Sequence, residues 1–141
     1  YFSRGTRLGI FESASIRAGI IICYDFRFPC FVSRMAREHS LDFIIHPCAF
    51  FRDGSFPSWH HFAVTRALEN QVYFLSLNRA GKQWGRSIFC PPWIDWETVP
   101  CVMGDDECLS FFNVSRDAVE KSRHTYPLRH DERASYTDLR P

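Results

Sequence analysis

The chain has 141 residues, a formal net charge of +1 and a hydrophobic share of 45%, with 14 phenylalanines. This length suits one domain with one core, and the composition excludes an intrinsically disordered chain. A charge near zero without long runs of like charge argues against nucleic acid or a membrane as a partner. Of the 17 cationic residues only Lys82 and Lys121 are lysines, so we expect arginines in ion pairs or interfaces.

The six cysteines are scattered along the chain, and no pair has C-x-x-C spacing. This scatter and the lack of a recognisable signal peptide predict reduced thiols and a cytoplasmic protein. Cys101 and Cys108 lie far from His124 and His130 in sequence, whereas structural zinc sites bring their ligands in tight pairs. No metal site is therefore predicted.

Hydrophobic patterns predict alternating strands and helices over the first half of the chain. Three isoleucines behind Gly19 are too β-branched for a comfortable helix and indicate a strand buried on both faces. Pro29 suits the first turn of a helix, and Ser58 is a candidate N-cap. The predicted strands are 8–12, 16–23, 41–46 and 72–77, and the predicted helices are 29–39 and 59–70. The resulting βαβ units predict an α/β fold with parallel central strands.

The signals are weaker after Gly85. We expect a strand at 86–89, a loop with a hairpin near Val102, a strand at 108–114 and a helix at 115–123. The tail from residue 124 is polar and has no hydrophobic period, so we expect it to be disordered or held by something outside this core.

Cys23 is the candidate nucleophile. It closes the predicted central strand, where the chain turns toward Pro29, and a side chain there projects from a rigid element while backbone N–H groups of the turn can face an oxyanion. The loop 48–57 leaves the same edge of the sheet, where ligands bind in open α/β sheets. The alternative interpretation is that Cys23 is a small buried hydrophobe.

Several ordered segments resemble the nitrilase superfamily, also called carbon–nitrogen hydrolases. They are Gly19-x-x-x-Cys23-Tyr24-Asp25-x-Arg27-Phe28-Pro29, then Trp59 with Arg66-Ala67-x-Glu69-Asn70, Asn78 and Gly81, then Gly85-x-Ser87, and finally Arg123, Tyr126-Pro127 and Tyr136. The resemblance implies that residues 1–141 form a single domain, with a C-terminal arm from about 124 to 141. This domain would be the C-terminal half of a four-layer αββα sandwich, contributing a mixed sheet with helices on one face.

The resemblance also implies a chemistry. Cys23 would attack a small amide or nitrile and form a thioester, with no cofactor and no metal, and the backbone N–H of Tyr24 would help to bind the oxyanion. Arg27 and Trp59 fall near the family's substrate pocket, although an ion pair and core packing are their alternative roles. Arg66 and Glu69 are expected to form a structural pair. Family members associate, so we expect a homo-oligomer.

The family's catalytic lysine and glutamates precede the nucleophile strand. Here no lysine precedes Cys23, and Glu12 is the only glutamate before it. We therefore expect the isolated chain to be an incomplete enzyme. A non-catalytic assembly or regulatory subunit is the alternative, and a redox thiol protein with Cys30 as the resolving cysteine is a third.

Departures from the family pattern leave the substrate open. Cys30 stands where a glutamate is usual, and Ser58 where a histidine often precedes the tryptophan. His46 and Cys48 flank Pro47 in place of small or polar residues.

Overall fold

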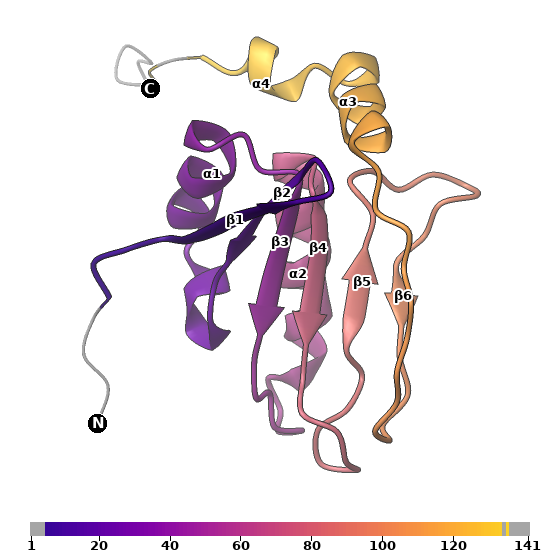
Figure 1. Ribbon diagram of the computed structural model, residues 1–141. Coiled ribbons are helices and arrows are strands. Elements are labelled where there is room, and N and C mark those ends of the chain that lie inside the picture. The colour runs from indigo at the N-terminus through magenta and orange to yellow at the C-terminus, as the bar shows by residue number, and fades with distance from the viewer. Residues whose placement is uncertain (1–4, 134, 136–141) are drawn as a thin grey trace, which may run out of the picture.

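Six strands form one mixed sheet in the order β1-β2-β3-β4-β5-β6 (Figure 1). The strands are β1 (Gly9–Ser13), β2 (Ile16–Ile20), β3 (Phe43–Pro47), β4 (Tyr73–Leu77), β5 (Ile88–Cys90) and β6 (Cys101–Val102). The central strands β2, β3 and β4 are parallel, and the outer pairings are antiparallel. This arrangement confirms the predicted α/β fold with a mixed sheet.

The computed structural model describes residues 5–133 and residue 135. Part of the predicted C-terminal arm, including Tyr136 of the family pattern, therefore lies outside the described residues. None of the helices in the described ranges is long and apolar enough to span a membrane.

Two helices cover one face of the sheet. They are α1 (Pro29–Glu38) and α2 (Phe56–Asn70), and α2 lies behind β3 and β4 in Figure 1. Between β2 and α1 the chain makes one short 3-10 helix, η1 (Cys23–Arg27). The main core lies between this face and the two helices, where Phe26, Ile44, Trp59 and Phe74 are fully buried. Burying each such side chain contributes roughly 1.5–3 kcal/mol.

α2 begins earlier than predicted. It starts at Phe56 after Ser55, so Ser58 is a residue of the first turn and not the N-cap. Pro57 was expected in a loop, but its fixed φ and missing N–H suit the first turn of a helix.

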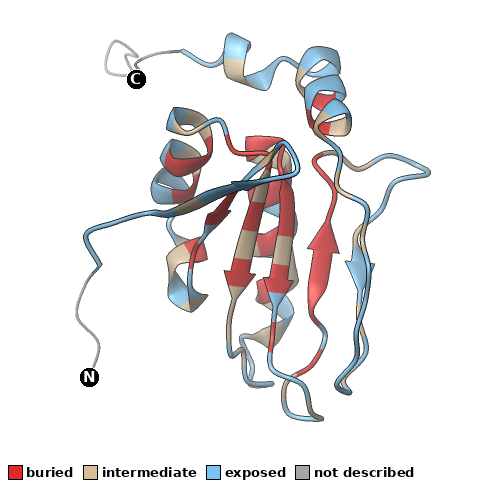
Figure 2. Ribbon diagram, in the orientation of Figure 1, coloured by how far each residue is buried: buried red, intermediate tan, exposed pale blue. Residues whose placement is uncertain are grey.

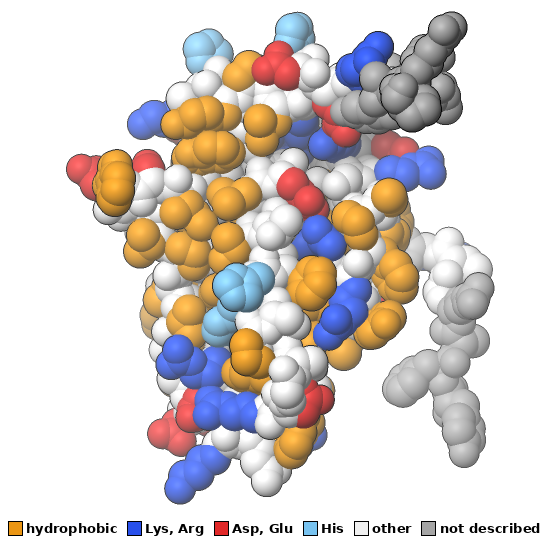
Figure 3. Space-filling view, turned by 180° about the vertical axis from the view of Figure 1, so that it is seen from behind, with side chains coloured by type: hydrophobic (Ala, Val, Ile, Leu, Met, Phe, Trp, Pro, Cys, Tyr) orange, Lys and Arg blue, Asp and Glu red, His pale blue; other side chains and the backbone are white. Residues whose placement is uncertain are grey.

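The outer surface on the helix-covered side of the sheet carries hydrophobic side chains interspersed with charged ones (Figure 3).

The opposite face of the sheet is covered around β4 and β5. There Tyr73, Phe89 and Val119 form a smaller buried cluster beneath α3 (Arg116–Thr125) and the segment that precedes it. That segment was predicted to be a strand at 108–114, which is wrong, because it forms no ladder with β6. Leu109 and Phe111 on it are exposed.

Over β2 the same face is only partly covered, because Ala18 is buried whereas Ile20, nearer the carboxyl end of the strand, is exposed. The neighbouring strand β1 is also largely exposed (Figure 2). The predicted burial of the central strand on both faces is therefore wrong. Ile20 is 39% exposed and Ile22 is 62% exposed, whereas Ile21 is buried against the helices. The segment has the β-branched composition of a fully covered strand, but at its carboxyl end only one layer of the described residues packs on it.

The C-terminal segment is docked on this chain's own core. Asp42, which is buried before β3, accepts hydrogen bonds from the backbone N–H of Arg17 at 2.9 Å and from Arg116 Nη2 at 2.8 Å. Arg123 Nη2 donates to Leu41 O at 2.6 Å. The expected arginine ion pairs are thus confirmed.

Residues beyond α3 continue this docking. The side chain of Gln71 donates to the carbonyl of Tyr126 at 2.8 Å, and Arg129, on the short helix α4 (Leu128–Asp131), donates to the carbonyl of Asn70 at 2.8 Å. Arg37 pairs with Glu132. For residues 124–133 the expectation of a tail that is disordered or held from outside is wrong, because these hydrogen bonds join the segment to Gln71 and Asn70 of this chain's own core.

Candidate active site

Cys23 sits at the point where the chain leaves β2 and enters η1. Its φ is +49°, a left-handed conformation that costs a side-chain-bearing residue roughly 1–2 kcal/mol. Such a conformation persists only where the surroundings impose it, and it is concentrated at functional sites. Cys23 is half-buried, in contrast to Cys90, which is a buried residue of the core.

Hydrogen bonds at both ends of η1 fix this turn. At the start, Asp25 Oδ2 accepts the backbone N–H of Ile22 at 2.9 Å. At the other end, Arg66 Nε donates to the carbonyl of Phe26 at 2.8 Å. Arg66 is only 4% exposed, and it also pairs with Glu69 at 2.8 Å, which confirms the predicted structural pair.

A third contact reaches Cys23 itself. The ring of His46 on β3 is fully buried, with Nε2 2.8 Å from the Cys23 carbonyl oxygen and Nδ1 2.7 Å from Ser76 Oγ on β4. Burial lowers the pKa of His46 to about 4, against smaller opposing effects of the Cys23 hydrogen bond and the Asp25 charge. The imidazole is therefore neutral at pH 7.

Sequence reasoning had treated His46 only as a departure from the family pattern and had not considered Ser76. The signal that could have found them is the strand register. His46 and Ser76 are direct partners in the parallel β3–β4 ladder, so the two side chains share one face.

Tyr24 and Arg27 extend from the same turn. The N–H of Tyr24 lies in the first turn of η1, where backbone donors have no acceptor within the helix. The Arg27 guanidinium lies 5.5 Å from the ring centre of Tyr24 and 5.4 Å from that of Phe62, and its Nε is buried without a hydrogen-bond partner. Arg27 is thus packed among aromatic rings, and its role in a substrate pocket stays a prediction.

Trp59 lies behind the turn, fully buried. Its ring stacks on Phe50 with 5.2 Å between centres, and its Nε1–H donates to Ser76 Oγ at 2.7 Å. This position is that of a core residue connected to the site through Ser76. A direct role in lining a substrate pocket also stays a prediction.

All six cysteines are free. Cys30, the resolving cysteine considered for a redox protein, is exposed on α1. The structure places Cys48 at the end of β3, beside the strand that leads to Cys23. Burial chiefly, with a smaller effect from Cys23, raises the pKa of Cys48 to about 11, so its thiol is protonated at neutral pH.

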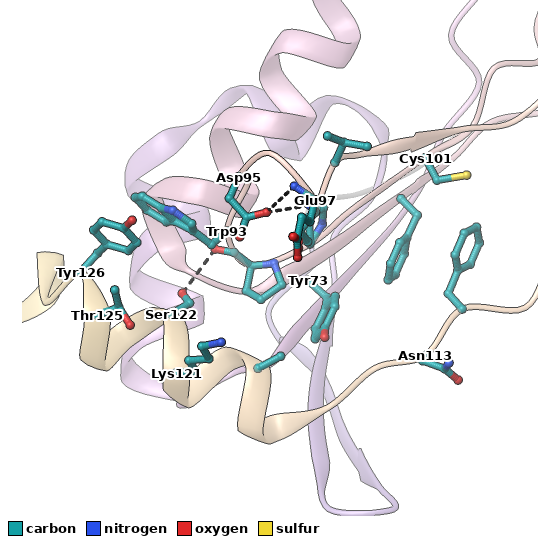
Figure 4. A pocket seen from close by; sticks show the side chains of 17 residues that line it. Tyr73, Trp93, Asp95, Glu97, Cys101, Asn113, Lys121, Ser122, Thr125 and Tyr126 are labelled. Carbon is teal, nitrogen blue, oxygen red and sulfur yellow. Dashed lines mark hydrogen bonds between the residues drawn. The ribbon is translucent and has the colours of Figure 1, made fainter.

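A pocket of about 580 Å³ lies elsewhere, between α3 and the β5–β6 connection (Figure 4). Its walls include the stacked rings of Trp93 and Tyr126, whose centres are 4.0 Å apart, and the side chain of Lys121. Tyr73, which begins β4, also lines it, so this pocket lies toward the amino ends of the parallel strands. Cys23 follows the carboxyl end of β2, and this pocket is therefore not the site of the thiol.

The fold and the site define a class: an α/β protein with a strained cysteine in the turn between a parallel strand and a helix, a position typical of nucleophiles. Sequence comparison defines the class more closely. The sequence model of the carbon-nitrogen hydrolase family matches residues 1–97, more than half of the chain. The chain belongs to this family.

Individual relatives agree. Omega-amidase NIT2 of Xenopus tropicalis is 26% identical over 93% of this chain and 48% of its own length. Omega-amidase NIT3 of Saccharomyces cerevisiae is 29% identical over 86% of this chain and 43% of its own length. The crystal structure of the Saccharomyces cerevisiae protein Nit3, described as a member of the nitrilase superfamily, superposes with a TM-score of 0.75 and 27% identity, covering 89% of this chain and 47% of that chain. The chain spans about half the length of the curated relatives it matches.

Proposed function

We propose that this chain carries the nucleophile of an amidase that hydrolyses a small amide through a thioester on Cys23. The observation that carries the proposal is the left-handed backbone of Cys23 at the carboxyl edge of the sheet, in a turn that the buried side chains of His46 and Arg66 hold by hydrogen bonds. The omega-amidase relatives support this reaction class.

The reaction follows from the thiol. The Cys23 thiolate attacks the amide carbonyl carbon, a C–S bond forms, and the carbonyl electron pair moves to oxygen. The N–H of Tyr24 donates to that oxygen in this proposal, and losing one such donor costs about 3 kcal/mol of transition-state stabilisation. Collapse breaks the C–N bond and the nitrogen leaves as ammonia after taking a proton. Water then hydrolyses the thioester to the acid and the free thiol.

We also propose that this chain corresponds to the C-terminal half of the whole protein. The roughly half coverage of its relatives supports this assignment. The exposed apolar face, with Phe11, Ile20 and Leu77, suits a covering second sheet, as in an αββα sandwich. The base that takes the thiol proton and the cation that faces the oxyanion would then come from the other half. A small amide or nitrile remains the proposed substrate class, and a homo-oligomer the proposed assembly.

The test uses the whole parent protein and a panel of small amides, with ammonia release as the readout. We expect turnover and an acyl adduct on Cys23 in mass spectra, and the Cys23→Ala variant should lose both. Cys30→Ala, which removes an exposed thiol on α1, is the matched control and should retain activity. Equal turnover by the parent and the Cys23→Ala variant would overturn the assignment, whereas no turnover of any amide by the parent itself would favour a non-catalytic assembly subunit.

A further inference from the structure

We propose that His46 is a positioning residue for Cys23, a neutral imidazole that holds the Cys23 carbonyl and so keeps the thiol presented. Ser76 and Trp59 fix the ring in the tautomer that this task requires. The inference rests on the proposed function, in which Cys23 is the nucleophile.

The contacts leave one arrangement of hydrogens. A carbonyl oxygen only accepts, so His46 Nε2, 2.8 Å from Cys23 O, carries the proton and donates. In a neutral ring Nδ1 is then an acceptor, and the Ser76 hydroxyl donates to it at 2.7 Å. Ser76 Oγ in turn accepts the indole N–H of Trp59 at 2.7 Å, because that group is a donor only. The chain of donors runs from Trp59 through Ser76 and His46 to Cys23.

The surroundings of His46 keep this series of hydrogen bonds intact at neutral pH. His46 stacks on Phe26 with 4.5 Å between ring centres and lies 5.7 Å from the ring centre of Phe74. These apolar contacts disfavour a charged ring. A protonated Nδ1 would become a donor, and Ser76 could no longer donate to it.

The contact has a direct consequence for the nucleophile. The other side-chain hydrogen bonds described for the turn act on other residues, at Ile22 N–H and Phe26 O. His46 acts on the carbonyl of the strained residue itself. Without this bond the backbone of Cys23 can relax toward an ordinary conformation, which would turn the thiol away from the substrate. A misplacement of about 1 Å can cost about 100-fold in rate.

Two substitutions of His46 separate positioning from packing. In His46→Gln the amide nitrogen reaches the place of Nε2 and can still donate to Cys23 O. In His46→Asn the shorter side chain reaches only the place of Nδ1, so that bond is lost while a polar group remains. Ile44→Ala is the control, because Ile44 is fully buried on the same strand and face but is not part of the donor chain.

The measurements are kcat and KM for an amide on the whole parent protein, with thermal unfolding and iodoacetamide labelling of Cys23 followed by peptide mapping. We expect His46→Asn to lower kcat by about 10- to 100-fold with little change in KM, and to slow the labelling of Cys23. His46→Gln should stay within about threefold of the parent, since it keeps the donor. Ile44→Ala should destabilise the protein without slowing either reaction below its unfolding temperature.

Equal losses in the Asn and Gln variants, or an equal loss of kcat in Ile44→Ala, would overturn the proposal and reduce His46 to a structural role. If His46→Asn does not fold, Ser76→Ala replaces it, since it removes the donor to Nδ1 and should lower kcat at unchanged KM. Turnover by Cys23→Ala would contradict the proposed function. If Cys23→Ala is inactive but the His46 and Ser76 variants match the parent, only the positioning role of His46 is contradicted.

Discussion

Arg66 of α2 donates its Nε–H to the carbonyl oxygen of Phe26, 2.8 Å away, and so ties a crossover helix to the turn that begins at Cys23. The pair is 40 residues apart in sequence, and the guanidinium is almost fully buried. The bond satisfies a buried acceptor and also supports the catalytic candidate, because it anchors the far end of η1.

Arg66→Ala should lower the free energy of unfolding by about 3 kcal/mol, because it leaves the Phe26 carbonyl without its side-chain donor and removes the cation that pairs with Glu69. Urea unfolding measures this loss. Arg34→Ala is the matched control: it also removes an arginine paired with a glutamate on a helix, but both of those groups are exposed, so it should cost about 0.5 kcal/mol or less. Equal losses in the two variants would contradict the buried role of Arg66.

Asp42→Asn should loosen the docking of α3. Its buried carboxylate accepts from the Arg17 backbone at 2.9 Å and from Arg116 at 2.8 Å, and the amide that replaces it carries no charge for the arginine. Losing this charge-assisted pair should cost about 2–3 kcal/mol of unfolding free energy. Limited trypsin digestion should then cut after Arg116 or Arg123 well before the core, and unchanged digestion would argue against this anchor.

Stability should fall on acidification because of His46. Its pKa is about 4 in the folded chain against 6.5 for the free group, so between these values the unfolded chain binds more protons than the native one. The stability contribution is fully present above pH 6.5 and is lost as the pH falls toward 4, with a limit of roughly 3 kcal/mol.

Urea unfolding at pH 7, 5 and 4 tests this dependence. The His46→Gln variant should show a flatter profile, since its side chain does not titrate. His60→Gln is the comparison, because His60 is half-buried and its pKa is also lowered, chiefly by burial. The expectation fails if removing His46 leaves the slope of the parent unchanged.

The thiols should differ in reactivity at pH 8. Burial raises the pKa of Cys90 to about 12 and, as the largest cause, that of Cys48 to about 11. Only the thiolate reacts, so at pH 8 a pKa of about 11 in place of 9.0 lowers the rate for Cys48 about 100-fold. Iodoacetamide labelling with peptide mapping should modify the exposed Cys30 and Cys108 long before Cys48 and Cys90. Early labelling of Cys90 in the folded protein would contradict its burial.

Local sequence determined the order of elements from β1 to β4 and the place of the candidate nucleophile. The isoleucines before Cys23 and the proline after it define a strand, a turn and a helix, because β-branched residues and a fixed φ act within a few residues. Pro29 begins α1 as predicted, and Arg66 and Glu69 pair as their helical spacing indicates. The resemblance to the family likewise depends on residue types and spacing, which are read from the sequence directly.

Tertiary structure decided what those residues do. The left-handed backbone of Cys23, its contact with His46 and the pairing of His46 with Ser76 depend on the register of parallel strands joined by long crossovers. The exposure of Ile20 and the docking of α3 on Asp42 depend on which layers cover which face. A local hydrophobic pattern records the period of an element, but not the partner that lies across the sheet from it, because that partner is brought there by residues distant in sequence.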